Sequence, residues 1–127
     1  MFDYTITTER TVEEAVKSIT EQLKEEAFGV LWDFDLANKL EEKGLGFEGE
    51  YRILEVCNPK EASRVLTEDR TAGYFLPCKI AVFTEEGKTK IGMPRPTALI
   101  ALVEDEKLKQ VASDVEERLI KAIDASK

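Results

Sequence analysis

The sequence predicts an α+β fold, in which an antiparallel sheet is covered on one face by helices. Strand-like stretches alternate apolar and polar residues, helix-like stretches place apolar residues every three or four positions, and a hairpin pattern covers residues 76–93. Alternating strands suit an antiparallel sheet with one face against helices, and not a doubly wound parallel sheet. A length of 127 residues suits a single domain over residues 1–127.

The first half of the chain predicts three strands separated by helices. Residues 2–7 alternate as a half-buried strand. Thr11 and Glu14 form a capping box that begins an amphipathic helix, and we expect this helix to extend to about residue 27. Apolar residues at every second position then alternate with Gly29, Asp33 and Asp35, which predicts a second strand with these apolar residues on one side: Phe28, Val30, Trp32, Phe34 and Leu36. Asp35 can cap a short helix over 36–43, and a third strand follows at 51–57.

The second half predicts a helix, the hairpin and two closing helices. Asn58 and Pro59 suit the cap and the first position of a helix. The hairpin consists of strands at 76–84 and 88–93, joined by a two-residue loop at 86–87. This loop length places the large apolar residues of the hairpin on one buried face and leaves Lys88 and Lys90 exposed. The residues expected to be buried are Ile80, Val82, Ile91 and Met93. A short helix at 96–103 and a long one from 105 to about 125 complete the fold.

Composition excludes several function classes. The chain has no histidine, so catalytic triads and zinc sites that use imidazole are excluded. Two cysteines are too few for a four-thiolate zinc site within one chain, so we expect no metal and no cofactor. A net charge of −8 disfavours nucleic-acid binding, because that affinity depends on neutralising phosphates.

The N-terminal residues lack the basic and apolar regions of a secretory signal, and the longest apolar run, 98–103, is far shorter than the ~20 residues of a membrane span. With only two cysteines the chain is no disulfide scaffold, so we expect a cytoplasmic protein without a membrane partner. Gly44, Gly46 and Gly49 match the dinucleotide-binding spacing, but they follow a helix and precede a strand. We therefore interpret them as a loop.

The two cysteines are the most interesting candidate site. Cys57 directly precedes a helix N-terminus, which lowers a thiol pKa, and Cys78 begins a strand. If strands 51–57 and 76–84 are antiparallel neighbours, the two thiols could approach each other. Two small buried hydrophobic side chains are the alternative interpretation.

Charged residues give weaker candidates. Asp33 and Asp35 could form a carboxylate pair, but solvated side chains with Asp35 as a helix cap are the simpler interpretation. The one locally basic region holds Lys79, Lys88, Lys90 and Arg95. Arg95 lies between two prolines that fix its position, so it could bind an anionic ligand or simply form a turn.

Two segments, Tyr51-Arg52-Ile53-Leu54 continuing to Cys57-Asn58-Pro59, and Leu76-Pro77-Cys78, resemble the bacterial and archaeal family called domain of unknown function 302. The resemblance covers about residues 2–125. It implies a compact α+β domain of strand–helix–four strands–helix order, grouped with TATA-binding-protein-like folds, and no established activity. It also implies that a family site would lie in these segments, which contain Cys57, Asn58, Pro77 and Cys78.

Three hypotheses of function follow. The first is a small-molecule binding or sensing module, with Cys57, Asn58, Cys78 and Arg95 as tentative ligand-binding residues. The second is a thiol-based redox protein or thiolate-dependent enzyme that uses Cys57 and Cys78. The third is a purely structural interaction protein. We further expect a homodimer built on a specific apolar patch, at a sheet edge or on a helix face.

Overall fold

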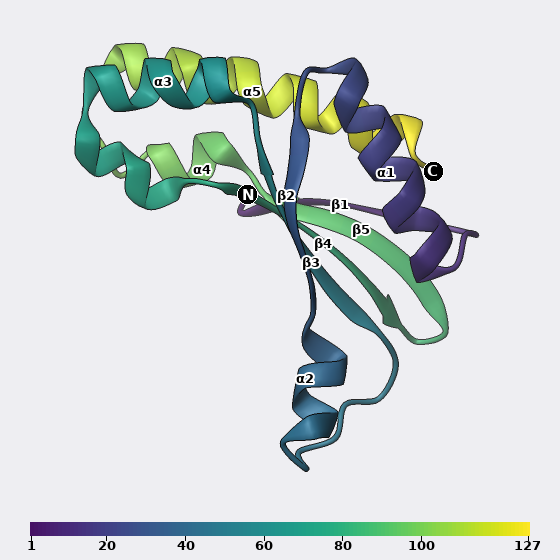
Figure 1. Cartoon of the computed structure of the whole chain (residues 1–127). Helices are drawn as coiled ribbons and strands as arrows, with labels where there is room; N and C mark the ends of the chain where they lie inside the picture. The colour runs from purple at the N-terminus through teal and green to yellow at the C-terminus, as the bar shows by residue number, and fades with distance from the viewer.

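A computed structural model describes all residues, 1–127, and contains one five-stranded sheet. All neighbouring strands are antiparallel, in the order β1-β5-β4-β3-β2 (Figure 1). The elements in chain order are β1 (Asp3–Thr8), α1 (Val12–Glu25), β2 (Gly29–Asp35), α2 (Leu36–Glu42), β3 (Tyr51–Cys57), α3 (Pro59–Glu68), the 3-10 helix η1 (Arg70–Phe75), β4 (Cys78–Glu85), β5 (Lys88–Pro94), α4 (Pro96–Ile100) and α5 (Glu106–Ala125).

The predicted α+β class and antiparallel sheet are confirmed. Helices α1 and α5 pack on one face of the sheet, whereas α2 extends away from the body of the molecule and packs against β3 (Figure 1). Helix α3, η1 and α4 gather beside the N-terminal half of α5 and project beyond the end of the sheet. The other face of the sheet has no helix across it, and we call it the open face. None of the helices is long and apolar enough to cross a membrane.

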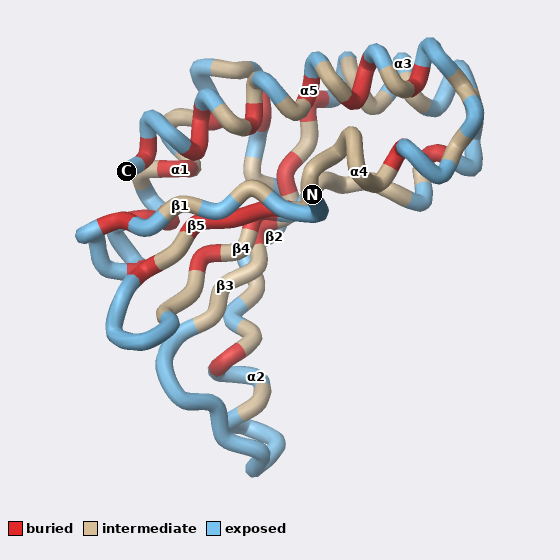
Figure 2. The backbone as a smooth tube through the Cα atoms, turned by 180° about the vertical axis from the view of Figure 1, so that it is seen from behind, coloured by how far each residue is buried: buried red, intermediate tan, exposed pale blue.

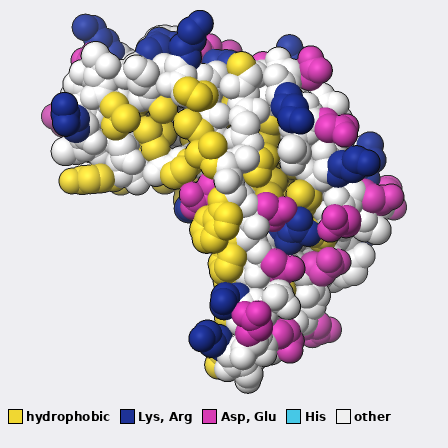
Figure 3. All heavy atoms as spheres, in the orientation of Figure 1, with side chains coloured by type: hydrophobic (Ala, Val, Ile, Leu, Met, Phe, Trp, Pro, Cys, Tyr) yellow, Lys and Arg dark blue, Asp and Glu magenta, His cyan; other side chains and the backbone are white.

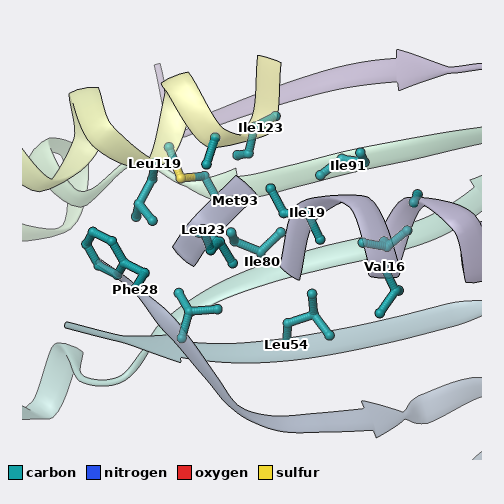
Figure 4. Packing of buried hydrophobic residues seen from close by; sticks show 14 of the residues in the cluster. Val16, Ile19, Leu23, Phe28, Leu54, Ile80, Ile91, Met93, Leu119 and Ile123 are labelled. Carbon is teal, nitrogen blue, oxygen red and sulfur yellow. The ribbon is translucent and has the colours of Figure 1, made fainter. Parts of the chain in front are cut away.

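The main core lies between the sheet and helices α1 and α5. Apolar positions of the two helix stripes interdigitate with strand residues of the helix-covered face (Figure 4), and burial is concentrated in this layer (Figure 2). The fully buried large side chains of this cluster are Val12, Ile19, Leu23, Leu54, Val56, Ile80, Val82, Ile91, Leu119 and Ile123.

The hairpin has the predicted register. Glu85 pairs with Lys88 and Val82 with Ile91. Glu86 and Gly87 have φ values of 52° and 77°, which fit a two-residue loop of the type I′ kind. The four predicted core residues of the hairpin are buried and Lys88 is exposed. Lys90 lies on the open face as the register requires, but its predicted full exposure is wrong: it is half-buried, with its ammonium group paired to Glu85.

Strand β2 differs from its predicted alternation. A bulge between Val30 and Trp32 shifts the register, so that Val30 pairs with buried Val56 while Trp32 pairs with Glu55. Because successive residues point to opposite faces, Trp32 and Phe34 lie on the open face. The prediction that they share a side with Phe28 and Val30 is therefore wrong.

The helix starts follow the predicted caps. Thr11 and Glu14 form the complete capping box of α1, and the Asp35 carboxylate accepts a hydrogen bond from the Asn38 amide. The Asn58 side chain accepts from the amides of Lys60 and Glu61. Helix η1 was not predicted from the sequence. Asp69 caps it, and the Asp69 carboxylate accepts a hydrogen bond from the Thr71 amide.

Candidate functional site

A cavity of about 450 Å³ lies at the end of the sheet, enclosed by the ends of β3, β4 and β5 and by α3, η1, α4 and α5. Nineteen of its 25 lining residues are hydrophobic, so its interior offers dispersion and apolar contact to a guest. This volume falls within the ~300–1,000 Å³ of ordinary ligand sites. The hydrophobic lining residues include Val56, Val65, Phe75, Leu99, Val111 and Val115.

The cavity exists because the α3–η1–α4 layer is too thinly packed to fill the space against α5. Helix α3 has no fully buried residue, and the buried cluster beneath it contains only Ala72, Ile100, Leu108 and Ala112. Alanines from three elements line the space, and their short side chains leave it open: Ala62, Ala72 and Ala112. Figure 3 shows hydrophobic side chains at the surface of this region, between α3 and α4.

Both cysteines line the cavity and are free thiols. Strands β3 and β4 are antiparallel neighbours, as the sequence analysis supposed, and Cys78 pairs with Val56, next to Cys57. Burial raises the pKa of the Cys78 thiol to about 11, with a further upward contribution from the nearby Cys57. Cys78 is therefore a neutral thiol at pH 7. It forms part of the apolar lining and does not act as a nucleophile.

The register also limits a disulfide between the two cysteines. Cys78 lies opposite Val56, so Cys57 is offset from it by one position. Successive residues of a strand point to opposite faces, and a disulfide requires Cβ atoms that approach each other. A Cys57–Cys78 bond therefore requires local rearrangement at the end of β3.

We expect the raised pKa of Cys78 to make stability fall above pH 9. The folded-state pKa lies above the unfolded value of ~8.5–9, so this thiol favours the fold below pH 9 and loses that contribution as pH rises toward 11. The loss should be on the order of 2–3 kcal/mol. Urea denaturation of the wild type and of Cys78→Val, measured from pH 7 to pH 11, isolates this thiol from the tyrosines and lysines. Equal pH slopes in the two proteins would contradict the prediction.

The polar groups at the cavity are already satisfied by partners in the chain. Asn58 is buried, and its side chain caps α3. Lys79 forms an ion pair with Glu55 at 2.6 Å. Glu61 pairs with Arg64 at 2.9 Å and lies 3.6 Å from Arg118. No buried side-chain nitrogen or oxygen lacks a hydrogen-bond partner, so the site presents no uncompensated charge to a guest.

The other sequence candidates lie away from this cavity. Arg95 is not among the lining residues, although both flanking prolines are; its guanidinium pairs with Glu116 at 3.2 Å and stacks over Tyr4. Glu116 in turn accepts hydrogen bonds from the amide and hydroxyl of Thr97, which ties the start of α4 to α5.

The two aspartates and the glycine loop have structural partners elsewhere. Asp33 is ion-paired with Arg52, which also contacts Glu13 of α1, whereas Asp35 caps α2. The three glycines of the dinucleotide-like spacing have φ values between 69° and 99° in the loop between α2 and β3, as the loop interpretation expects.

The place and the lining of the cavity were not predictable from the sequence. Its lining comes from seven elements, most of them distant in sequence, and apolar periodicity indicates only that a residue faces inward, not whether its partner fills the space. The one available signal was the short side chains of Ala62, Ala72 and Ala112, and it becomes interpretable only once α3, η1 and α5 are known to lie close together.

Fold and cavity together define a small α+β protein with an apolar interior site. The family model described as domain of unknown function DUF302 matches residues 4–126, and the chain belongs to this family. It is similar to the crystal structure of an uncharacterized conserved protein DUF302 from Bacillus stearothermophilus, with 50% identity and a TM-score of 0.97. That likeness covers 100% of this chain and 99% of the other. No curated protein matches the sequence.

Proposed function

We propose that this protein binds a small, uncharged and largely apolar molecule in the cavity at the end of the sheet. The observation that supports this proposal is the partly open cavity of about 450 Å³ with a predominantly hydrophobic lining. Closely packed interiors leave few voids larger than a water molecule, so a space of this size in a small chain requires a reason. Binding or sensing of an apolar ligand supplies one.

The charges around the cavity favour a neutral guest over an anion. The N-terminal amides of α3 that could bind an anion are engaged: those of Lys60 and Glu61 by the Asn58 side chain and that of Ala62 by the Asn58 carbonyl. Lys79 is paired with Glu55, and Glu61 is itself negative. A carboxylate in this cavity would therefore lose its water without gaining a partner.

A thiol-based activity at Cys57 and Cys78 has weaker support. The pKa of Cys78 is raised by burial, and the register offsets the two thiols on neighbouring strands. Both properties disfavour rapid thiol–disulfide chemistry, because the thiolate is the reactive form.

The uncharged fluorescent probe N-phenyl-1-naphthylamine tests the proposal. We expect its emission to rise on addition of the folded protein, to be displaced by 1-decanol, and to be little affected by decanoate at pH 7. Ala62→Trp places an indole in the cavity and should weaken probe binding by about tenfold or more, equivalent to ~1.4 kcal/mol. Ala101→Trp, at an exposed position outside the lining, is the matched control.

A second filled variant and two outcomes decide the matter. Val65→Trp, from the same wall of the cavity, provides a second filled variant if Ala62→Trp does not fold. Probe binding that is equally strong in the filled variants and the wild type would place the probe elsewhere and contradict the proposal. Displacement by decanoate as effective as that by decanol would contradict the preference for an uncharged ligand.

A further inference from the structure

The open face of the sheet carries a continuous cluster of large apolar side chains. Trp32 and Phe34 of β2 stack with ring centroids 5.1 Å apart, and Tyr51 of β3 stacks on Phe83 of β4 at 5.0 Å. Ile53 lies between the two pairs. It is the register partner of Phe34 in β2, and it follows Tyr51 by two positions in β3, so it points to the same face. We call these five residues the aromatic patch.

The patch is unusual for an uncovered face. An antiparallel sheet with one solvated side normally presents polar residues to water. The β1 side of this open face does so, with Thr5 and Thr7 exposed, whereas Trp32 in the patch retains 55% of its accessible surface. Figure 3 shows hydrophobic side chains gathered along β2, below the overhang formed by α3 and α4.

A projecting arm, residues 36–50, borders the patch. It consists of α2 and the loop that leads to β3, and it extends from the end of the sheet opposite the cavity (Figure 1). Leu45 in the arm is 72% exposed, and Phe47 is 36% exposed with its ring edge-on to Tyr51 at 6.0 Å. The arm therefore extends the apolar surface of the patch beyond the edge of the sheet.

We propose that two copies of this chain pair through their open faces, as a symmetric dimer in which the aromatic patches stack on each other. The expectation from the sequence was a sheet edge or a helix face, and this proposal uses the open sheet face instead. Its support comes from the charge pattern, the size and the shape of the surface.

The charge pattern of the open face is complementary to itself. Glu55 and Lys79 form an ion pair beside the patch, and Lys90 pairs with Glu85 at its far margin. This region is therefore neutral, although the chain carries a net charge of −8. A two-fold rotation can bring Glu55 of one copy near the Lys79 of the other, whereas a strongly charged partner would find no counterpart.

The open face approaches the size of a standard dimer interface. Five strands about 4.8 Å apart, with roughly seven residues each at ~3.4 Å per residue, cover on the order of 500 Å² in flat projection. Side-chain relief and the arm add to this area. The sum approaches the ~800 Å² per partner of a standard interface.

The shape of the molecule suits an antiparallel pairing of the two copies. The α3–α4 region overhangs the open face at one end, and the arm projects at the other end (Figures 1 and 3). A two-fold axis across the open face would place the arm of each copy beneath the overhang of its partner. Two sheets packed in this way, about 10 Å apart, bury their facing side chains in a common layer.

Trp32 is the single tryptophan of the chain and reports directly on this surface. We expect light scattering to give twice the chain mass of 14.3 kDa, and tryptophan emission to shift to longer wavelength on dilution as Trp32 becomes exposed to water. Trp32→Glu should give the monomer mass, whereas Lys17→Glu, a charge change at an exposed position of α1 on the other side of the sheet, should remain a dimer. A monomer mass for the wild type at concentrations up to about 100 µM would overturn the proposal.

Charge reversal across the pair provides a second and independent test. Glu55→Lys leaves two positive charges on the face, and Lys79→Glu leaves two negative charges, so each variant alone should be monomeric. Mixing the two variants should restore a mixed dimer, because unlike faces then meet between chains. Because the two changes lie on different chains, this rescue cannot arise from the ion pair within one chain. Failure of the mixture to associate, with both variants folded and the wild type dimeric, would place the dimer contact elsewhere and overturn the proposal.

Discussion

Replacing Val82 with aspartate is expected to destabilise the fold by about 3–5 kcal/mol. Val82 is fully buried, pairs with Ile91 in the hairpin, and lies in the cluster beneath α1. The one basic group beside this position is Arg52, the register partner of Val82 in β3, and its guanidinium is already paired with Asp33 and Glu13. A new carboxylate must therefore compete for Arg52, remain poorly solvated or take up a proton. Each of these costs free energy that a small domain, with a total stability of ~5–15 kcal/mol, can scarcely lose.

Urea denaturation followed by circular dichroism measures the effect of Val82→Asp. Lys88→Asp, in the neighbouring strand but exposed, is the matched control and should change stability by no more than about 0.5 kcal/mol. The cost in Val82→Asp should also fall at pH 4, where the new carboxyl is partly protonated. A loss below about 1 kcal/mol at pH 7 would show that this side of the hairpin does not face the core.

Truncation of Leu119 to alanine is expected to cost about 2–5 kcal/mol. Leu119 is fully buried in α5 and contributes both to the main core and to the cavity wall. The lost side chain joins a space that already exists, so the surrounding residues cannot collapse to fill it. The cost should therefore lie in the upper part of the range for this substitution.

The same substitution at an exposed leucine provides the control for Leu119→Ala. Leu102 is 85% exposed, and Leu102→Ala should leave the free energy of unfolding nearly unchanged. Leu119→Ala should also admit a bulkier uncharged probe than the wild type does, because its cavity is larger. A loss of stability with no change in probe selectivity would separate the core role of Leu119 from its role in the cavity.

The sequence was most informative where one physical requirement dominates. In the hairpin, only a two-residue loop keeps Lys90 off the face that contains Ile80 and Val82, and the burial of those residues makes the alternative register costly. The caps of α1 and α3 were also predictable, because Thr11 and Asn58 satisfy amides that would otherwise lack a partner.

Strand β2 was mispredicted because large apolar residues recur at every second position across a bulge. Leu31 is the one irregularity in this pattern, since it is apolar between Val30 and Trp32, but only pairing with β3 shows that the register shifts there. The consequence is functional as well as geometric, since the bulge is what moves Trp32 and Phe34 onto the open face.

The candidate site was predictable only in part. The adjacency of Cys57 and Cys78 followed from an assumed antiparallel pairing, which the register bears out. The pKa of Cys78 did not follow, because it depends on burial by helices that are distant in sequence. The role of Arg95 in joining α4 to α5 through Glu116 was likewise not visible from the two prolines beside it.

The bulge in β2 also bears on aggregation. Strand β2 is one edge of the sheet, and an unprotected edge offers a row of free amides and carbonyls on which another chain can add a strand. The irregular spacing between Val30 and Trp32 interrupts this row, and the chain turns into α2 directly after Asp35. Fibril growth from this edge would have to flatten the bulge first, so the strand that exposes the most aromatic surface is also poorly suited to template a cross-β ladder.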